Sequence, residues 1–156
     1  MRWHYRDAAL LWLFPPAYLL HVAEELWGGP GFPQWLAMVA GQPLPYAAFA
    51  VINTIGMIVL IVGVRAAARH EASGWIAVAI ATVATVNALL HIGGSLLTGT
   101  YSPGLITAVV LYVPLGQLLL IRALHQADRR GFARGIVVGV LIHAVVSAIA
   151  LALARW

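Results

Sequence analysis

Long apolar runs separated by short polar segments make up almost the whole chain. Five runs are long enough to cross about 30 Å of hydrocarbon as a helix that rises 1.5 Å per residue. They cover residues 8–27, 47–65, 74–97, 103–124 and 135–154. The pattern therefore predicts an all-α fold: a polytopic membrane helical bundle of five transmembrane helices, forming one domain over residues 1–156.

The composition supports a membrane protein and excludes an ordinary soluble core, because 62% of the 156 residues are hydrophobic and only 9% are charged. The net charge of +4 does not indicate nucleic-acid binding, since the arginines fall between the apolar runs. Arginine excess marks the cytoplasmic side of a membrane protein, so we expect a cytoplasmic N-terminus. Eight arginines lie on that side of the five-helix arrangement, Arg2, Arg6, Arg65, Arg69, Arg122, Arg129, Arg130 and Arg134, and only Arg155 lies on the other.

The chain lacks two residue types, cysteine and lysine, and each absence bears on the metal ligands or on the cellular location that we expect. The chain has no cysteine, which excludes disulfides and thiolate ligands. It also has no lysine beside abundant alanine and arginine, a usage typical of GC-rich bacterial genomes. We therefore expect a protein of the bacterial inner membrane, in which a metal ion would need histidine, carboxylate or water ligands.

The first apolar run ends in a cluster of ionisable side chains, His21-Val22-Ala23-Glu24-Glu25. A carboxylate within a membrane span costs at least about 2.5 kcal/mol, so it normally faces a protein interior that supplies partners. At about 100° per residue, His21, Glu24 and Glu25 share one helix face. The motif therefore predicts a functional site.

Other polar side chains recur at intervals of four residues beside small residues. Such spacing allows close helix packing, which alone could explain part of the pattern. Counted from the outer end of each run, His21 and His91 both lie roughly 9 Å deep and His143 roughly 15 Å deep. We expect these groups to form a layer in the outer half of the bundle that includes Asn53, Asn87, His91, Ser95, Tyr112 and His143.

The residue types in this layer fit a metal centre. Imidazole and carboxylate ligands suit zinc, iron or manganese, and the candidate ligands are His21, Glu25, His91 and His143. Glu24 and Glu25 are the candidate catalytic groups, with Glu24 as a general base toward a metal-held water. Asn53, Asn87, Tyr112 and Ser95 are expected to contact substrate or to support the ligands.

Three functions fit this chemistry. The first is a membrane-embedded, metal-dependent enzyme that hydrolyses or oxidises a lipid-soluble substrate entering between helices. The second is a metal-free isomerase or terpene-cyclase-like enzyme in which a glutamate transfers protons. The third is a small metal or proton carrier, which is weakened because the polar layer stops in the outer half. Expected partners are membrane lipid, the lipid-soluble molecule and a second copy of the chain, but no nucleic acid.

The segment over residues 28–45 has no charge, many glycines and prolines, and an apolar middle. One interpretation is an interfacial or re-entrant lid over the site. The other is a simple connector in which Trp35 anchors at the lipid headgroups together with Trp27 and Tyr46.

Three segments stand out together: His21-Val22-Ala23-Glu24-Glu25, Asn87-Ala88-Leu89-Leu90-His91-Ile92 and Tyr101-Ser102-Pro103-Gly104. In these segments the chain resembles the HXXEE-domain family of small bacterial membrane proteins. The resemblance implies a polytopic membrane fold and marks these polar residues as family features, but it carries no activity. A looser similarity to the CAAX-processing glutamate intramembrane proteases is analogy only, because the arginine that follows their glutamate pair is missing here.

Overall fold

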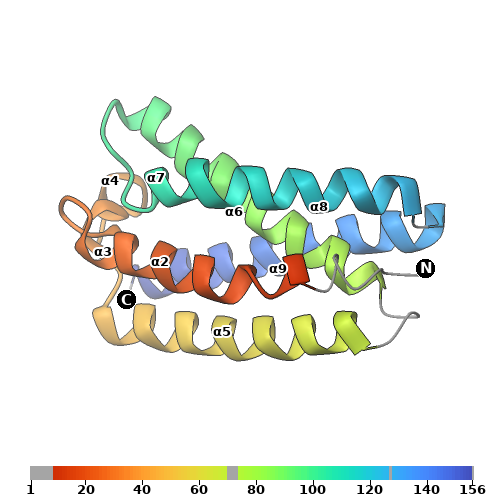
Figure 1. The fold of residues 1–156 in the computed structure, drawn as a ribbon. Coiled ribbons are helices and arrows are strands. Elements are labelled where there is room, and N and C mark those ends of the chain that lie inside the picture. The colour runs from red at the N-terminus through yellow and green to blue at the C-terminus, as the bar shows by residue number, and fades with distance from the viewer. Residues whose placement is uncertain (1–8, 70–73, 127, 156) are drawn as a thin grey trace.

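The computed structural model describes residues 9–69, 74–126 and 128–155. These ranges contain helices and no strand, which confirms the all-α prediction (Figure 1). The first half contains α2 (Phe14–Trp27), the one-turn helices α3 (Phe32–Trp35) and α4 (Ala37–Ala40), and α5 (Tyr46–Arg69). The second half contains α6 (Gly74–Thr98), α7 (Leu105–Thr107), the π-helical turn η2 (Ala108–Tyr112), α8 (Val113–Gln126) and α9 (Arg129–Leu153).

Four helical segments of the described chain are long and apolar enough to span a membrane: Tyr46–Arg69, Gly74–Thr98, Leu105–Gln126 and Arg129–Leu153. The prediction of five is wrong, because the first apolar run is not one continuous helix. Its regular part begins at Phe14, with Pro15 and Pro16 in the first turn, where a missing N–H is tolerated. The 14 residues of α2 extend for only about 21 Å.

The central helix is α6, which contacts α5, α8 and α9 and crosses obliquely between α5 and α8 in Figure 1. Its buried face is largely alanine. A Cβ at Gly135 or Gly139 of α9 would lie 2.4 Å from Cβ of Val78 or 2.6 Å from Cβ of Thr82. Small residues therefore bring the two helix backbones together, and the predicted glycine stripe of α9 serves packing.

The two ends of the bundle differ in character. One end is built from α3, α4 and α7, beside the last turns of α2 (Figure 1). The other end is formed by the last turns of α5 and α8 and the first turns of α6 and α9, and it holds six arginines: Arg65, Arg69, Arg122, Arg129, Arg130 and Arg134. Arg155 follows α9 at the first end, and Arg2 and Arg6 lie outside the described residues. The arginines of the described chain are thus segregated.

The π-helical turn η2 has a local cause in the sequence. Val113 donates its backbone N–H to the carbonyl of Ala108, five residues earlier, and Pro114 follows directly. Proline has no N–H and its ring crowds the carbonyl four residues before it. The helix therefore widens just before Pro114, and such widened turns are frequent at functional sites.

Candidate metal centre

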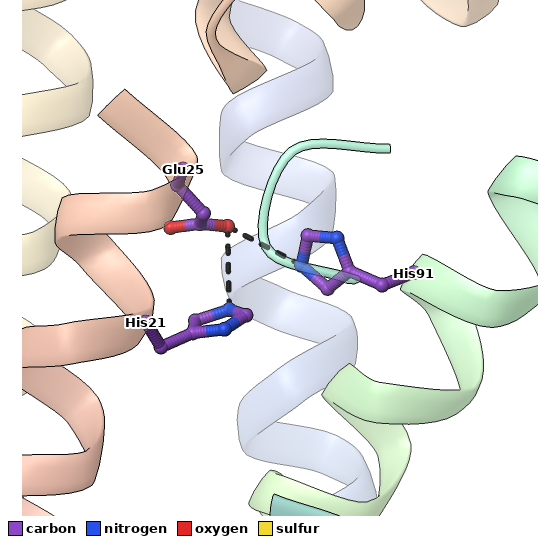
Figure 2. Close-up of side chains that lie close together, drawn as sticks. All are labelled: His21, Glu25 and His91. Atoms are coloured by element: carbon purple, nitrogen blue, oxygen red, sulfur yellow. Dashed lines mark ion pairs between the residues drawn. The ribbon is translucent and has the colours of Figure 1, made fainter. Parts of the chain in front are cut away.

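Three of the predicted ligands meet in the interior of the bundle. His21 and Glu25 lie one turn apart on the same face of α2, and His91 approaches from α6 (Figure 2). The Nε2 atoms of His21 and His91 lie 3.6 and 3.3 Å from Oε1 of Glu25, and all three ligand atoms lie within 4.8 Å of one another. Tetrahedral zinc with bonds of 2.0–2.1 Å separates its ligand atoms by about 3.3 Å. The spacing therefore fits a divalent cation.

The site is closed to solvent. His21, Glu25 and His91 are only 2%, 7% and 4% exposed. The rings of the two histidines meet edge to face with centroids 4.9 Å apart, and the ring of Phe32 lies 5.6 Å from that of His91. Electrostatic interactions are strong in such a water-poor interior, so any ion held here would be bound by its protein ligands.

A hydroxyl group holds the far side of each imidazole. Nδ1 of His21 lies 2.8 Å from Oγ1 of Thr107, and Nδ1 of His91 lies 3.0 Å from Oγ of Ser102. Such outer hydrogen bonds fix the orientation of metal-binding histidines. The backbone N–H of Ser102 donates in turn to Oγ of Ser95 over 2.9 Å. Ser95, predicted to support the ligands, is thus linked to the site through Ser102.

The hydrogen bonds of Thr107 determine the tautomer of His21. Its hydroxyl donates to the carboxylate of Glu24, because an ionised carboxylate can only accept. Oγ1 of Thr107 then accepts from Nδ1–H of His21, which leaves Nε2 of the neutral ring with a lone pair. That Nε2 atom is buried and has no hydrogen-bond partner. A cation placed between it and Glu25 would satisfy both.

Glu24 lies outside this group of three and anchors a different part of the chain. Its carboxylate accepts hydrogen bonds from the hydroxyls of Tyr101 and Thr107. It also accepts from the backbone N–H groups of Ile106 and Thr107, at 2.8 and 2.7 Å. These four donors match the roughly four lone-pair sites of a carboxylate. Glu24 thus ties α7 to α2, and the general-base role predicted for it remains a prediction.

The partner of Glu24 in the loop before α7 is a strong donor. Partial burial, together with the hydrogen bond to Glu24 and the negative charge of that carboxylate, raises the pKa of Tyr101 to about 12. The Tyr101 hydroxyl therefore keeps its proton near neutral pH and remains a donor to Glu24.

Gly104 brings the backbone of the loop before α7 against the three candidate ligands His21, Glu25 and His91. Its φ is +100°, and a Cβ there would lie 2.8 Å from Cε1 of both His21 and His91 and 3.0 Å from Cγ of Glu25. Gly104, Ser102 and Thr107 were not predicted as site residues. The only signal was the segment Tyr101-Ser102-Pro103-Gly104, which enters the family resemblance without a role.

The π-helical turn completes the surroundings of His21. Tyr112, at its end, is buried, and its ring lies 4.6 Å from the ring of His21, centroid to centroid. Thr107 immediately precedes the same turn. The widened turn therefore presents both side chains to one imidazole, and Tyr112 lines the group as predicted.

Three other predicted residues are not part of the group. His143 was predicted as a fourth ligand, but the ligand cluster of the described chain contains only His21, Glu25 and His91. The Nδ1 atom of His143 lies 3.1 Å from Oγ of Ser147 on its own helix. Asn53 accepts from the Tyr18 hydroxyl at 2.8 Å and donates to a backbone carbonyl. His143 belongs to the buried face of α9 together with Gly135 and Gly139, but it is not in the group of three. The roles predicted for His143 and Asn53 therefore remain predictions.

Asn87 lies on α6 one turn before His91, but among the described residues no hydrogen bond or ion pair joins its side chain to the three candidate ligands. Its Oδ1 atom is buried and has no hydrogen-bond partner. The role that was predicted for Asn87, contact with substrate or with the ligands, remains a prediction.

The segment over residues 28–45 packs over the site end of the bundle. Trp35 is only 5% exposed, and its indole N–H donates to Oγ1 of Thr100 over 3.1 Å. Its ring occupies the space beside Gly94, where a Cβ would lie 2.6 Å from Cη2 of the indole. Trp35 is therefore a buried packing residue and not the headgroup anchor of the connector interpretation, whereas Trp27 is exposed.

Comparison with known proteins yields one match. Residues 12–119, more than half of the chain, match the family described as "Protein of unknown function with HXXEE motif". The match includes the motif itself, His91 and the loop that carries Gly104. Neither the curated proteins nor the solved structures provide a match.

Proposed function

The chain belongs to the HXXEE family, and we propose that the motif holds a divalent metal ion in a membrane-embedded enzyme. His21 and Glu25 supply two ligands from α2, and His91 supplies the third from α6. The observation that carries the proposal is the buried Nε2 of His21, which lacks a hydrogen-bond partner while it faces a carboxylate oxygen. A buried polar atom of this kind is costly unless something binds it.

The ligand set is typical of catalytic rather than structural sites. Two imidazoles and one carboxylate leave coordination positions open, as in catalytic zinc sites and in non-haem iron oxygenases. An ion bound in this way supplies Lewis acidity or redox chemistry. Zinc would favour hydrolysis and iron would favour oxidation, so the identity of the metal separates the two reactions.

The other residues of the site orient the ligands and exclude water. Thr107 and Ser102 fix the two imidazoles, Tyr112 and Phe32 cover them, and Glu24 holds the loop that contains Gly104. The site lies within a bundle with four membrane-spanning candidates. A lipid-soluble substrate entering between helices is therefore the class that can reach it.

A metal analysis tests this proposal. We expect the detergent-purified protein to contain about one zinc, iron or manganese ion per chain, as a three-ligand site requires. His21→Ala removes a ligand and should lose the ion. The matched control is His143→Ala, which changes the same residue type outside the ligand group and should keep it. Elemental analysis of the three proteins by mass spectrometry, after preparation without chelators, provides the measurement.

Two results would contradict the proposal. One is wild-type protein without metal after incubation with each of the three ions. That result would favour the metal-free enzyme, in which Glu25 exchanges protons with the two histidines. The other is equal metal content in the wild type and His21→Ala.

We further propose that the protein lies in a bacterial inner membrane, with its arginine-rich end in the cytoplasm and the metal site near the outer face. The chain has no cysteine, so single cysteines can report the topology. Gln42 and His125 are both exposed, one at each end. In intact cells a membrane-impermeant maleimide should label Gln42→Cys, and it should label His125→Cys only after permeabilisation. The opposite pattern would show that the orientation is reversed.

A further inference from the structure

An apolar groove runs along the bundle between α2 and the segment formed by η2 and α8. One wall consists of four residues from the stretch that begins at Leu13 and ends at Leu20. The other consists of five residues from the stretch that begins at Val110 and ends at Leu118. All nine are apolar, and the volume is about 360 Å³. This size lies within the range of small-molecule sites, roughly 300 to 1,000 Å³.

Prolines shape both walls of the groove. Pro16 lies in the first turn of α2, and Pro114 lies in the first turn of α8, just after the π-helical turn. Each proline removes a backbone donor and crowds the preceding turn, so neither wall is a regular helix throughout. The groove is therefore specified by the local sequence of both walls.

The end of the groove nearest Leu20 lies beside the three candidate ligands His21, Glu25 and His91. Glu24 is one turn beyond Leu20 on the same face of α2, and Thr107 is one turn before the other wall. The hydroxyl and backbone N–H of Thr107 both donate to Glu24, so hydrogen bonds join the two helical segments at this end of the groove. Next to the walls in sequence are His21 and Tyr112, whose rings contact each other.

The depth and the lining of the groove indicate its occupant. One wall belongs to the membrane-spanning candidate Leu105–Gln126, so the groove opens into the hydrocarbon region. Helix pairs in membranes approach through small residues, but Ala17 is the only small side chain in the lining, and the rest are leucine, valine and proline. The lining therefore suits a flexible hydrocarbon chain better than a helix from a second copy.

We propose that this groove binds one hydrocarbon chain of the lipid-soluble substrate and directs the polar end of that lipid toward the metal group. The inference rests on the proposed function, because a lipid bound in the groove would react only if the neighbouring ligands hold a metal ion. It adds a substrate class to that function: a lipid with at least one flexible hydrocarbon chain.

Photolabelling tests the groove in the full chain. The protein is reconstituted in phosphatidylcholine nanodiscs that contain a trace of phosphatidylcholine with a diazirine in one acyl chain, and labelled residues are mapped by mass spectrometry. We expect about tenfold more label on the groove walls than on equally exposed residues of α5, the ratio given by a preference of about 1.4 kcal/mol.

A matched pair of variants locates the bound chain. Leu20 in the groove and Leu141 on α9 are 57% and 58% exposed, so both accept a larger side chain at a surface position. Leu20→Trp narrows the groove and should reduce the label on both walls to the level of α5. Leu141→Trp should leave the label on the groove walls unchanged.

Three outcomes would overturn the proposal. The label could spread evenly over all exposed apolar residues, or the two tryptophan variants could reduce the label on the groove walls equally. The third outcome is that Val110→Cys forms a disulfide-linked dimer in which the groove is no longer labelled, which would show that a second copy of the chain occupies it. The labelling does not require the ion. A protein that labels in the groove but binds no metal contradicts only the proposed function. A protein that binds metal but labels evenly contradicts only the groove.

Discussion

Replacing Gly104 with alanine is expected to abolish the proposed metal binding and to lower the free energy of unfolding by about 2 to 5 kcal/mol. The backbone strain comes from a φ of +100°, and the new Cβ would lie 2.8 Å from carbon atoms of both imidazoles. Neither ring can move away freely, because Thr107 and Ser102 hold their other sides. The added methyl group must therefore separate the ligands.

Gly99→Ala is the control for backbone strain alone. Gly99 lies in the same connection between α6 and α7 with a φ of +65°, but a Cβ there meets no atom within 4 Å. It should cost about 1 to 2 kcal/mol and leave metal content intact. Elemental analysis and thermal unfolding of both variants provide the measurement. Normal metal content in Gly104→Ala would mean that the loop lies farther from the ligands than the geometry places it.

The apolar pattern predicted the fold class well because hydrophobicity directly reports which segments can lie in lipid. The four long spans agree with the predicted runs to within a few residues, apart from α9, which begins six residues before the predicted 135. The first run failed because hydrophobicity does not report helix continuity, and Pro15 and Pro16 place the start of α2 at Phe14. The pattern of apolar residues also gave no sign of the π-helical turn before Pro114.

The candidate site was predictable where helix geometry alone determines contact. His21 and Glu25 are four residues apart on one helix, so their meeting follows from the sequence. His91 was identified from its depth, and the same reasoning also added His143, which is buried on α9 but is not in the group of three. The hydroxyl partners Thr107 and Ser102 depend on the path of the loop before η2, which no periodic pattern reveals.

The two adjacent glutamates of the motif have separate structural positions. Glu25 lies between two imidazoles in the interior, whereas Glu24 accepts four hydrogen bonds from residues 101–107. Adjacent helix positions point about 100° apart, so one pair of carboxylates can contact two imidazoles and a neighbouring loop at the same time. This division predicts different outcomes when each glutamate is neutralised.

Glu24→Gln is expected to weaken metal binding about 10- to 100-fold, the usual effect of losing a group that supports metal ligands. The amide keeps one acceptor oxygen but places an NH₂ group against donors that the carboxylate accepted. The first turn of α7 should detach, and the Thr107 hydroxyl would no longer be held against His21. Glu25→Gln, which changes a ligand itself, should instead lose stoichiometric binding.

Metal titration with elemental analysis and hydrogen exchange at the amides of Ile106 and Thr107 distinguish a loop anchor from a general base. An anchor predicts faster exchange at both amides in Glu24→Gln together with weaker metal binding. Tyr101→Phe removes only one of the four donors to Glu24 and should produce a smaller change in the same direction. If Glu24→Gln keeps wild-type exchange and metal affinity, the loop does not depend on this carboxylate. Glu24 would then be available as the base that the sequence first indicated.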